Sequence, residues 1–329
     1  LRLFAQNHRT FVVQNRSMLT RRHIRIKVMQ ALFAYYQGES LDRNRSLNGL
    51  NDSINAIYVL YLYELRMFWQ FHRFLEERLE IETQKQFPLQ PRIDRIKQLL
   101  DLPFMDALVQ DEGVIAAWEQ HRIFWGETVD VLRNAFFIFW STELESGWVD
   151  SSEELSDQDG VLWFKRFYRE AIANNESIHS HYEDVSMHWA DDLDAAQMMA
   201  VQTLQNAKRG KPLLVNLFKD ASDEAFGPTL FLKCMNAHDE FMDRIIGKAD
   251  KWDYERLAPV ERCLMEIALT EIVQFPEVPI KVSINEAIEL AKQYSSEKSP
   301  GFINGLIDAI VGDLKKEGRI QKIGRGLIE

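Results

Sequence analysis

The sequence predicts an all-α fold. Apolar residues recur at helical spacing through most of the 329 residues, and no stretch of useful length alternates apolar and polar residues as a strand does. Prolines mark the ends of the helical segments, and no convincing internal repeat is present. With 46% hydrophobic residues, the chain has enough apolar material for two domains or one large helical domain.

The predicted helices follow one another in chain order. The first covers residues 21–37, and a long second helix, capped by Asp52 or Ser53, runs to about Gln84. The next helices are expected near residues 118–140, 162–173, 187–207 and 223–241, with another that begins at Pro259.

The last two helices carry the clearest local signals. Ser283 and Glu286 have the spacing of a capping box, in which the hydroxyl accepts a backbone N–H and the carboxylate reaches back to another. Ser299 and Pro300 suit the N-cap and the first turn of the final helix. Gly305 lies inside that helix at a cost of ~1 kcal/mol relative to alanine, which predicts the close approach of another helix.

Two aromatic residues bracket the turn between these helices. Tyr294 precedes it, Phe302 follows it, and Lys298 lies within it. A single aromatic side chain more often packs inward than faces solvent, so burial of both rings is the simpler interpretation. Exposure of both rings beside a lysine would instead make a binding surface.

Charge is spread unevenly along the chain. Residues 142–194 hold fourteen acidic residues against three basic ones, a balance of −11 that equals the net charge of the whole chain. The remainder is neutral, with basic ends: residues 17–36 contain no acid, and residues 315–325 hold five basic residues against Glu317 alone. The overall acidity therefore does not exclude a nucleic-acid partner.

The first helix carries a cluster of arginines. Arg21, Arg22 and Arg25 fall within an arc of about 100° beside the apolar stripe. They lie at a helix N-terminus, where the macrodipole disfavours cations. An ordinary solvated face is one explanation. We favour an anionic partner, because it would offset both the mutual repulsion and the unfavourable dipole.

No pattern indicates catalysis or a cofactor. Cys234 and Cys263 form neither a disulfide framework nor a zinc spacing, which suits a reducing cytoplasm. His179, His181 and His188 are not spaced as metal ligands on one helical face, and their segment is expected to be a solvated acidic loop. Walker and dinucleotide fingerprints are absent, and no apolar run approaches the ~20 residues of a membrane span.

Both ends of the chain resemble the NusB family of bacterial transcription antitermination factors. RRHIRIKVMQALFAYYQ (21–37) resembles the family's Arg-rich first helix, in which basic residues precede an Ala-Leu-aromatic pattern. Residues 257–311 resemble the family more closely, over more than fifty residues. The matching segments are Glu261-Arg262, Ala268…Glu271, Val278-Pro279, Lys281-Val282, Asn285-Glu286-Ala287 and Phe302-Ile303-Asn304-Gly305.

The resemblance implies an all-helical protein without catalytic activity or cofactor. Such a protein would bind a short single-stranded boxA element of ribosomal RNA leaders together with NusE, a ribosomal protein of the small subunit. The complex would help RNA polymerase to resist termination and would assist ribosome assembly. By resemblance, the arginine helix would hold phosphates and the last turn would meet the bases. The side chains expected to contact RNA are Arg21, Arg22, Arg25, Lys27, Tyr294, Lys298 and Phe302.

The chain departs from the family in length. Nearly two hundred residues separate the first helix from about Asp223, far more than a typical member has, and Lys298 stands where acidic residues are common. Residues 1–17 are expected to be a non-native or disordered leader before a start at Met18, with an Arg-bearing transit peptide as the alternative. The expected domains are an N-terminal helical region with the acidic insertion (18–215), a NusB-like C-terminal helical subdomain (216–314) and a basic tail (315–329).

Three functional hypotheses follow. The leading one is an RNA- and NusE-binding factor of ribosomal RNA transcription. The second is a helical protein–protein adaptor of ribosome assembly that does not bind RNA. The third, a regulatory region of an rRNA methyltransferase, ranks below these because no methyl-donor domain follows residue 329.

Overall fold

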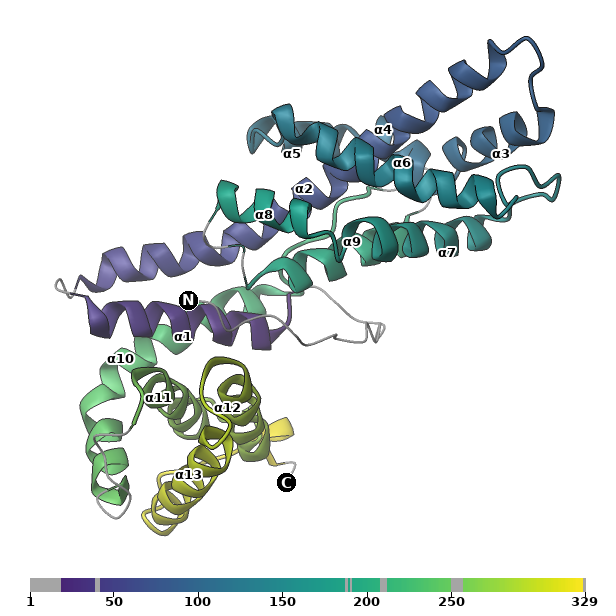
Figure 1. Cartoon of the computed structure of the whole chain (residues 1–329). Coiled ribbons are helices and arrows are strands. Elements are labelled where there is room, and N and C mark those ends of the chain that lie inside the picture. Colours follow the sequence, from purple (N-terminus) through teal and green to yellow (C-terminus); the bar gives the residue numbers. More distant parts are fainter. Residues whose placement is uncertain are drawn as a thin grey trace. The chain divides into compact units, whose positions relative to one another are not determined.

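The computed structural model describes residues 19–38, 42–186, 189, 191–207, 212–249 and 257–327. Helices and their connections make up all of this part of the chain, and no strand occurs in it (Figure 1). The predicted all-α fold is therefore confirmed. None of the helices in these ranges combines the length and the apolar character needed to cross a membrane.

Two compact units divide the chain, and they do not follow its order. One, here called the discontinuous unit, combines Thr20–Asn55 with Phe218–Glu329. The other, here called the middle unit, combines Ala56–Leu217 with Leu19, the first described residue. Helix α2 (Arg43–Thr83) begins in the first and continues in the second. The domain limits expected from the sequence stay a prediction.

The start of α2 differs from the prediction. The helix begins at Arg43, ahead of the proposed caps Asp52 and Ser53. Asp42 caps it, because its Oδ1 accepts the backbone N–H groups of Asn44 and Arg45 at 3.0 and 3.1 Å. The Ser53 hydroxyl lies inside the helix and donates to the carbonyl of Leu50 at 2.8 Å.

The middle unit has an aromatic core. Phe71 of α2 and Phe167 of α7 are fully buried and stack with ring centroids 4.1 Å apart. The other elements of the unit are α3 (Gln90–Leu100), α4 (Pro103–Gln110), α5 (Glu112–Gln120), a 3₁₀ turn (Gly126–Thr128), α6 (Val129–Glu145), α7 (Asp157–Phe167), a π-helical turn (Tyr168–Ile172), α8 (Glu176–Val185) and α9 (Leu193–Asn206).

A carboxyl group is buried in this core. Glu64 of α2 has no solvent exposure, and its Oε2 accepts a hydrogen bond from the Tyr168 hydroxyl at 2.5 Å. Burial raises the pKa of Glu64 to about 7, although the hydrogen bond from Tyr168 acts in the opposite direction. The core therefore holds a group whose charge changes near neutral pH.

The histidine-containing segment is helical, so the predicted acidic loop was wrong. His179 and His181 lie on α8, and His188 lies outside the described residues. Asn175 caps α8 by accepting the backbone N–H groups of Ser177 and Ile178, and an asparagine in this position is a helix start signal in the sequence. Within the described ranges, no cluster of three or more His, Cys, Asp or Glu side chains is placed to hold a metal ion.

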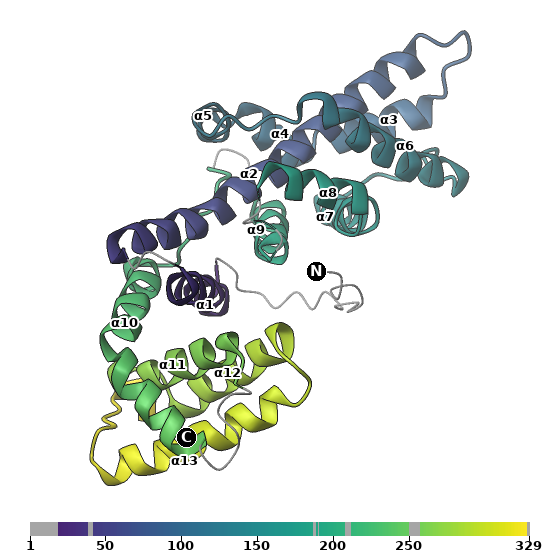
Figure 2. The same cartoon turned by 60° about the vertical axis from the view of Figure 1, so that its left-hand side comes forward.

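The discontinuous unit brings the first helix against the last four. Helix α1 lies beside α10 and α11, and α11, α12 and α13 pack against one another (Figures 1 and 2). Cys234 and Cys263 are buried free thiols in this unit, and burial raises the pKa of both. Its helices are α1 (Arg21–Gln37), the first part of α2, α10 (Ala221–Ala249), α11 (Pro259–Gln274), α12 (Ile280–Tyr294) and α13 (Ser299–Lys316).

A polar cluster ties α1 to α10 and α11. The fully buried Glu266 of α11 accepts a hydrogen bond from the Tyr36 hydroxyl at 2.8 Å, and it lies 3.0 Å from Nδ1 of His238. The rings of Tyr36 and His238 stack with centroids 4.2 Å apart. The hydrogen bond to Glu266 raises the pKa of His238, although burial opposes the shift.

This cluster predicts a pH-dependent stability. A raised histidine pKa contributes stability that is complete below the unfolded value of 6.5 and is lost as pH rises through the folded value. We expect the difference in urea midpoint between wild type and His238→Gln to shrink as the pH rises from about 5.5 to 8.5. A difference that stays constant across this range would contradict the assignment.

Candidate nucleic-acid interface

Arg21 and Arg22 lie at the exposed start of α1. Nε of Arg21 donates to Oδ1 of Asp223 on α10 at 2.7 Å. Arg22 makes a bidentate contact with Glu286 on α12, with N–O distances of 2.8 and 2.7 Å. The two arginine side chains remain 33% and 47% exposed. Both guanidinium groups are therefore held in fixed orientations while parts of them still face solvent.

Arg25 and Lys27 point into the unit instead. The Arg25 side chain is 5% exposed, and its Nε and Nη2 donate to the fully buried Glu271 at 2.6 and 3.1 Å. Ser283 of α12 donates to the same carboxylate at 2.8 Å. Lys27 is 1% exposed. Of the four basic side chains expected to contact RNA on this helix, only Arg21 and Arg22 reach the surface.

The predicted capping box at the start of α12 is absent. The helix begins at Ile280, about one turn before Ser283, and Pro279 precedes it in extended backbone. Ser283 and Glu286 therefore lie inside the helix, where they contact Glu271 and Arg22 rather than orphan backbone groups. The same two residues connect α12 to the arginines of α1.

Glu286 is kept ionised by its position. Burial alone would raise its pKa, but the hydrogen bond and charge of Arg22, together with the charge of Arg25, outweigh burial and lower it. The carboxylate thus remains available to Arg22 throughout the neutral range. It orients Arg22 and also cancels part of its charge.

The turn between α12 and α13 lies at the surface. Lys298 is exposed, and Tyr294 and Phe302 are each half-buried. Ser295 holds the turn in place, because its hydroxyl donates to Glu261 of α11 at 2.8 Å. The turn therefore presents one cation between two partly accessible rings.

An open cleft adjoins this turn. It has a volume of about 1010 Å³ and is lined by Lys298 and Phe302 on one side and by Lys248 of α10 on the other. Gly305 also lines it, and a Cβ added there would meet nothing within 4 Å. The prediction that another helix approaches Gly305 was wrong. The glycine instead leaves space beside the Phe302 ring.

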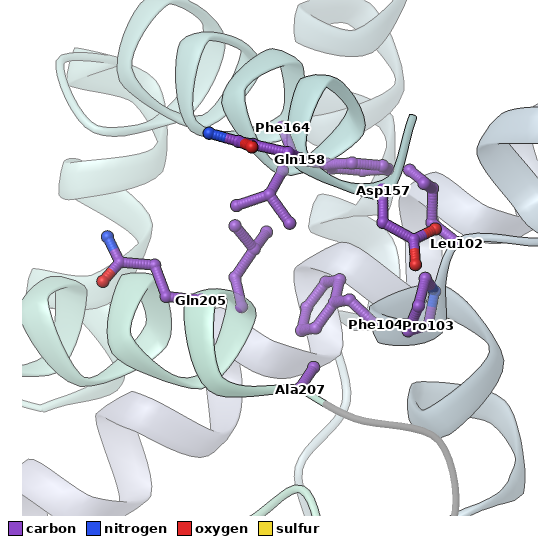
Figure 3. A pocket seen from close by; sticks show the side chains of 10 residues that line it. Leu102, Pro103, Phe104, Asp157, Gln158, Phe164, Gln205 and Ala207 are labelled. Atoms are coloured by element: carbon purple, nitrogen blue, oxygen red, sulfur yellow. The ribbon is translucent and has the colours of Figure 1, made fainter. Parts of the chain in front are cut away.

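The middle unit has a smaller pocket of a different kind. Its volume is about 270 Å³, and Gln158 and Phe164 of α7 lie on one side of it, with Phe104 of α4 and Ala207 after α9 side by side opposite them (Figure 3). The side chain of Gln205 lies at its edge, and the Asp157 carboxylate lies near Pro103. Among the described residues that line this pocket, none is Lys, Arg or His, so it is not suited to phosphate.

The sequence does not predict the carboxylates that orient the arginines. Glu271 and Glu286 both lie in the C-terminal segment that resembles the NusB family, so the sequence contained a signal for them. The resemblance marks both carboxylates, but only the fold pairs them with Arg25 and Arg22. Lys248 had no such signal, because it reaches the cleft only through the packing of α10 against α13.

Comparison with known proteins identifies the NusB family in the part of the chain that contains the turn and the cleft. The NusB family model matches residues 194–312. The transcription antitermination protein NusB of Salinibacter ruber is 48% identical over 115 residues, which are 35% of this chain and 71% of that protein. The NusB protein of Chloroherpeton thalassium is 48% identical over 89 residues, 27% of this chain and 42% of that protein. That of Natranaerobius thermophilus is 38% identical over 78 residues, 24% of this chain and 54% of that protein.

No solved structure matches the chain. The matched segment runs from α9 through most of α13 and so includes the turn, the cleft and the carboxylates that pair with the arginines. The alignment with the Salinibacter ruber protein covers 71% of that protein at 48% identity. On this ground the chain belongs to the NusB family of transcription antitermination proteins.

Proposed function

We propose that this protein is a non-enzymatic RNA-binding factor in ribosomal RNA transcription antitermination. It would bind boxA-like single-stranded leader RNA together with the ribosomal protein NusE, as part of an RNA polymerase antitermination complex in the cytoplasm. One observation carries the proposal. The arginine helix and the α12–α13 turn, although far apart in sequence, belong to one compact unit, and that unit contains most of the segment matched to the family.

The exposed side chains divide the work of binding. Arg21 and Arg22 would hold phosphates, while Tyr294 and Phe302 would stack with unpaired bases beside Lys298. On α12, the partner of Arg22 (Glu286) and Tyr294 are eight residues apart, about 12 Å along the helix axis. A short single strand can span that distance and contact both places.

The buried basic side chains have a different role in this proposal. Arg25 and Lys27 fix the position of α1 instead of touching RNA. Asp223 and Glu286 restrain Arg21 and Arg22, which lowers the entropy lost when a guanidinium binds phosphate. The same carboxylates cancel part of the positive charge. The surface therefore favours an anion, such as phosphate, whose oxygen atoms can accept hydrogen bonds from the guanidinium groups.

The double variant Arg21→Gln/Arg22→Gln tests the phosphate contacts. If each arginine neutralises one phosphate, the slope of log affinity for boxA RNA against log salt should flatten by about 1.4, at ~0.7 per phosphate. The matched control neutralises the exposed Glu153 and Glu154 of the middle unit, which should leave the slope unchanged. An unchanged slope in the arginine variant, with the fold intact by circular dichroism, would count against RNA binding by α1.

The adaptor without RNA binding remains the second candidate. It is favoured by the ion pairs of Arg21 and Arg22, which are those expected of arginines that only join helices. A gel shift with boxA leader RNA, with and without NusE, separates the two functions. Binding to NusE with no RNA shift in either condition would support the adaptor.

A further inference from the structure

The chain beyond α13 is held against the end of α11. Nζ of Lys322 donates to the carbonyl oxygens of Glu271 and Phe275, at 3.3 and 3.0 Å. The backbone N–H of Ile323 donates to the carbonyl of Pro276 at 3.1 Å. These contacts give residues 320–327, here called the tail, a defined position on the discontinuous unit.

A glycine locks this path. A Cβ added at Gly326 would lie 1.9 Å from the carbonyl oxygen of Pro276, so no other residue fits without moving the backbone. The tail has the sequence IQKIGRGL, which contains Lys322, the exposed Arg325 and no acid. It lies beyond the part of the chain matched by the family model, which ends at residue 312.

Lys322 of the tail has a different kind of hydrogen-bond partner from the basic side chains of α10 and α13. On α10 and α13, basic groups face carboxylates: Lys248 lies 2.5 Å from Asp313, and Arg244 lies 2.7 Å from Glu317. Lys322 instead faces carbonyl groups at the C-terminal end of α11. Carbonyl groups there satisfy hydrogen bonds and offer about half a negative charge, and no carboxylate makes an ion pair with Lys322 among the described residues.

A second lysine lies at the C-terminal end of α11, and its aromatic neighbours connect this place to α1. Lys233 of α10 donates to the carbonyl of Gln274 at 2.7 Å and lies 4.4 Å from the centre of the Phe275 ring. That ring meets Phe226 at a centroid distance of 5.6 Å, and the Arg21 guanidinium lies 4.7 Å from the Phe226 centre. Contacts thus run from Arg21 through the buried Phe226 ring to Phe275, whose carbonyl accepts from Lys322 of the tail.

The environment of Lys322 agrees with incomplete compensation. Burial lowers its pKa to about 8, and the Glu271 charge, which acts in the opposite direction, does not restore the ordinary value. The ammonium is still mostly protonated at pH 7. A charged ammonium group in this position can pair with a phosphate oxygen.

We propose that Lys233, Lys322 and Arg325 form a second phosphate-binding station, which continues the RNA path from Arg21 along the end of α11. This inference rests on the proposed function. The ligand is the backbone of the same single-stranded RNA, because Lys233 lies on α10 only seven residues after Phe226, the ring that Arg21 contacts, which is about 10 Å along the helix axis. The station reads no base sequence, since its donors are cations without base-specific geometry.

The test compares two double variants of equal charge in the full-length chain. For Lys322→Gln/Arg325→Gln we expect the salt slope of boxA RNA binding to flatten by about 1.4, at ~0.7 per phosphate. The control, Lys315→Gln/Lys316→Gln, removes two exposed lysines at the end of α13 and should leave the slope unchanged. If the two double variants have the same salt slope of RNA binding, the tail cations contribute no more than the control lysines, and the inference is overturned.

Two single variants keep the test decisive if the double variant is poorly folded. Arg325→Gln changes only an exposed side chain and should flatten the slope by about 0.7. Gly326→Ala keeps every charge but displaces the tail from Pro276, and it should weaken RNA binding several-fold at low salt. Wild-type affinity in Gly326→Ala would count against the station.

The outcomes separate this inference from the proposed function. Intact RNA binding by the tail variants, with wild-type slope, removes the station alone. If the tail variants bind RNA normally but no longer bind NusE, the station binds protein instead of RNA, and the inference is overturned. Failure of the wild-type chain to bind boxA RNA removes the proposed function itself.

Discussion

Replacing Glu271 with alanine should lower the free energy of unfolding by about 3–5 kcal/mol. The Glu271 side chain is fully buried and is the bidentate partner of Arg25, which is itself only 5% exposed. Without the carboxylate, Arg25 keeps its charge inside the unit, and the Ser283 hydroxyl loses its acceptor as well. Urea unfolding followed by circular dichroism measures the loss. A loss below about 1 kcal/mol would contradict the buried pair.

The matched control removes both charges together. Arg25→Met/Glu271→Leu keeps similar volumes, and most of the lost stability should return because no charge is left unpaired. This variant also decides the role of Arg25 in RNA binding. We expect its salt slope to equal that of wild type. A slope flatter by about 0.7 would return Arg25 to the set of phosphate contacts.

Phe302→Ala should lower RNA affinity by ~1–3 kcal/mol, the contribution of one stacked base. Its effect on stability should stay well below the ~3–5 kcal/mol of a core phenylalanine, because Phe302 is half-buried and borders the open cleft. Titration of RNA by fluorescence anisotropy and urea unfolding give the two quantities on one protein.

The buried Phe241 of α10 supplies the contrasting control. Phe241→Ala should cost the full core penalty in stability while leaving the affinity of the folded fraction unchanged. Lys298→Glu is a further check on the same turn, and we expect weaker binding chiefly at low salt, where repulsion of phosphate is least screened. Severe destabilisation by Phe302→Ala, with RNA affinity intact, would end the stacking proposal.

The sequence predicts a helix limit correctly where residues adjacent in the sequence determine it. Helix α1 covers Arg21–Gln37 as predicted, with Thr20 and Gly38 in extended backbone at its two ends. The start of α12 was not predicted correctly. Ser283 and Glu286 have the spacing of a capping box, but their side chains bind residues of other helices instead of the backbone of α12. Chain spacing alone does not distinguish these two uses of the same residues.

The candidate interface was predicted in part for a similar reason. Placing the arginines and the Lys298 turn on the surface needs only residue types and helical periodicity. Placing Arg25 inside needs a carboxylate that lies 246 residues later in the chain. The tail was missed because its path depends on carbonyl groups at the end of α11, which carry no signature in the side-chain sequence.

The discontinuous unit also sets an order of events during synthesis. Helix α1 leaves the ribosome early, but the carboxylate of its buried arginine is made 246 residues later, roughly 12–50 s at about 5–20 residues per second. Late in that interval, once Leu217 has been made, the middle unit has all of its own residues. The arginine helix must wait with its apolar stripe unpaired, so the newly made chain depends on slow, long-range closure. Chaperone binding to α1 is therefore most useful before the last hundred residues are translated.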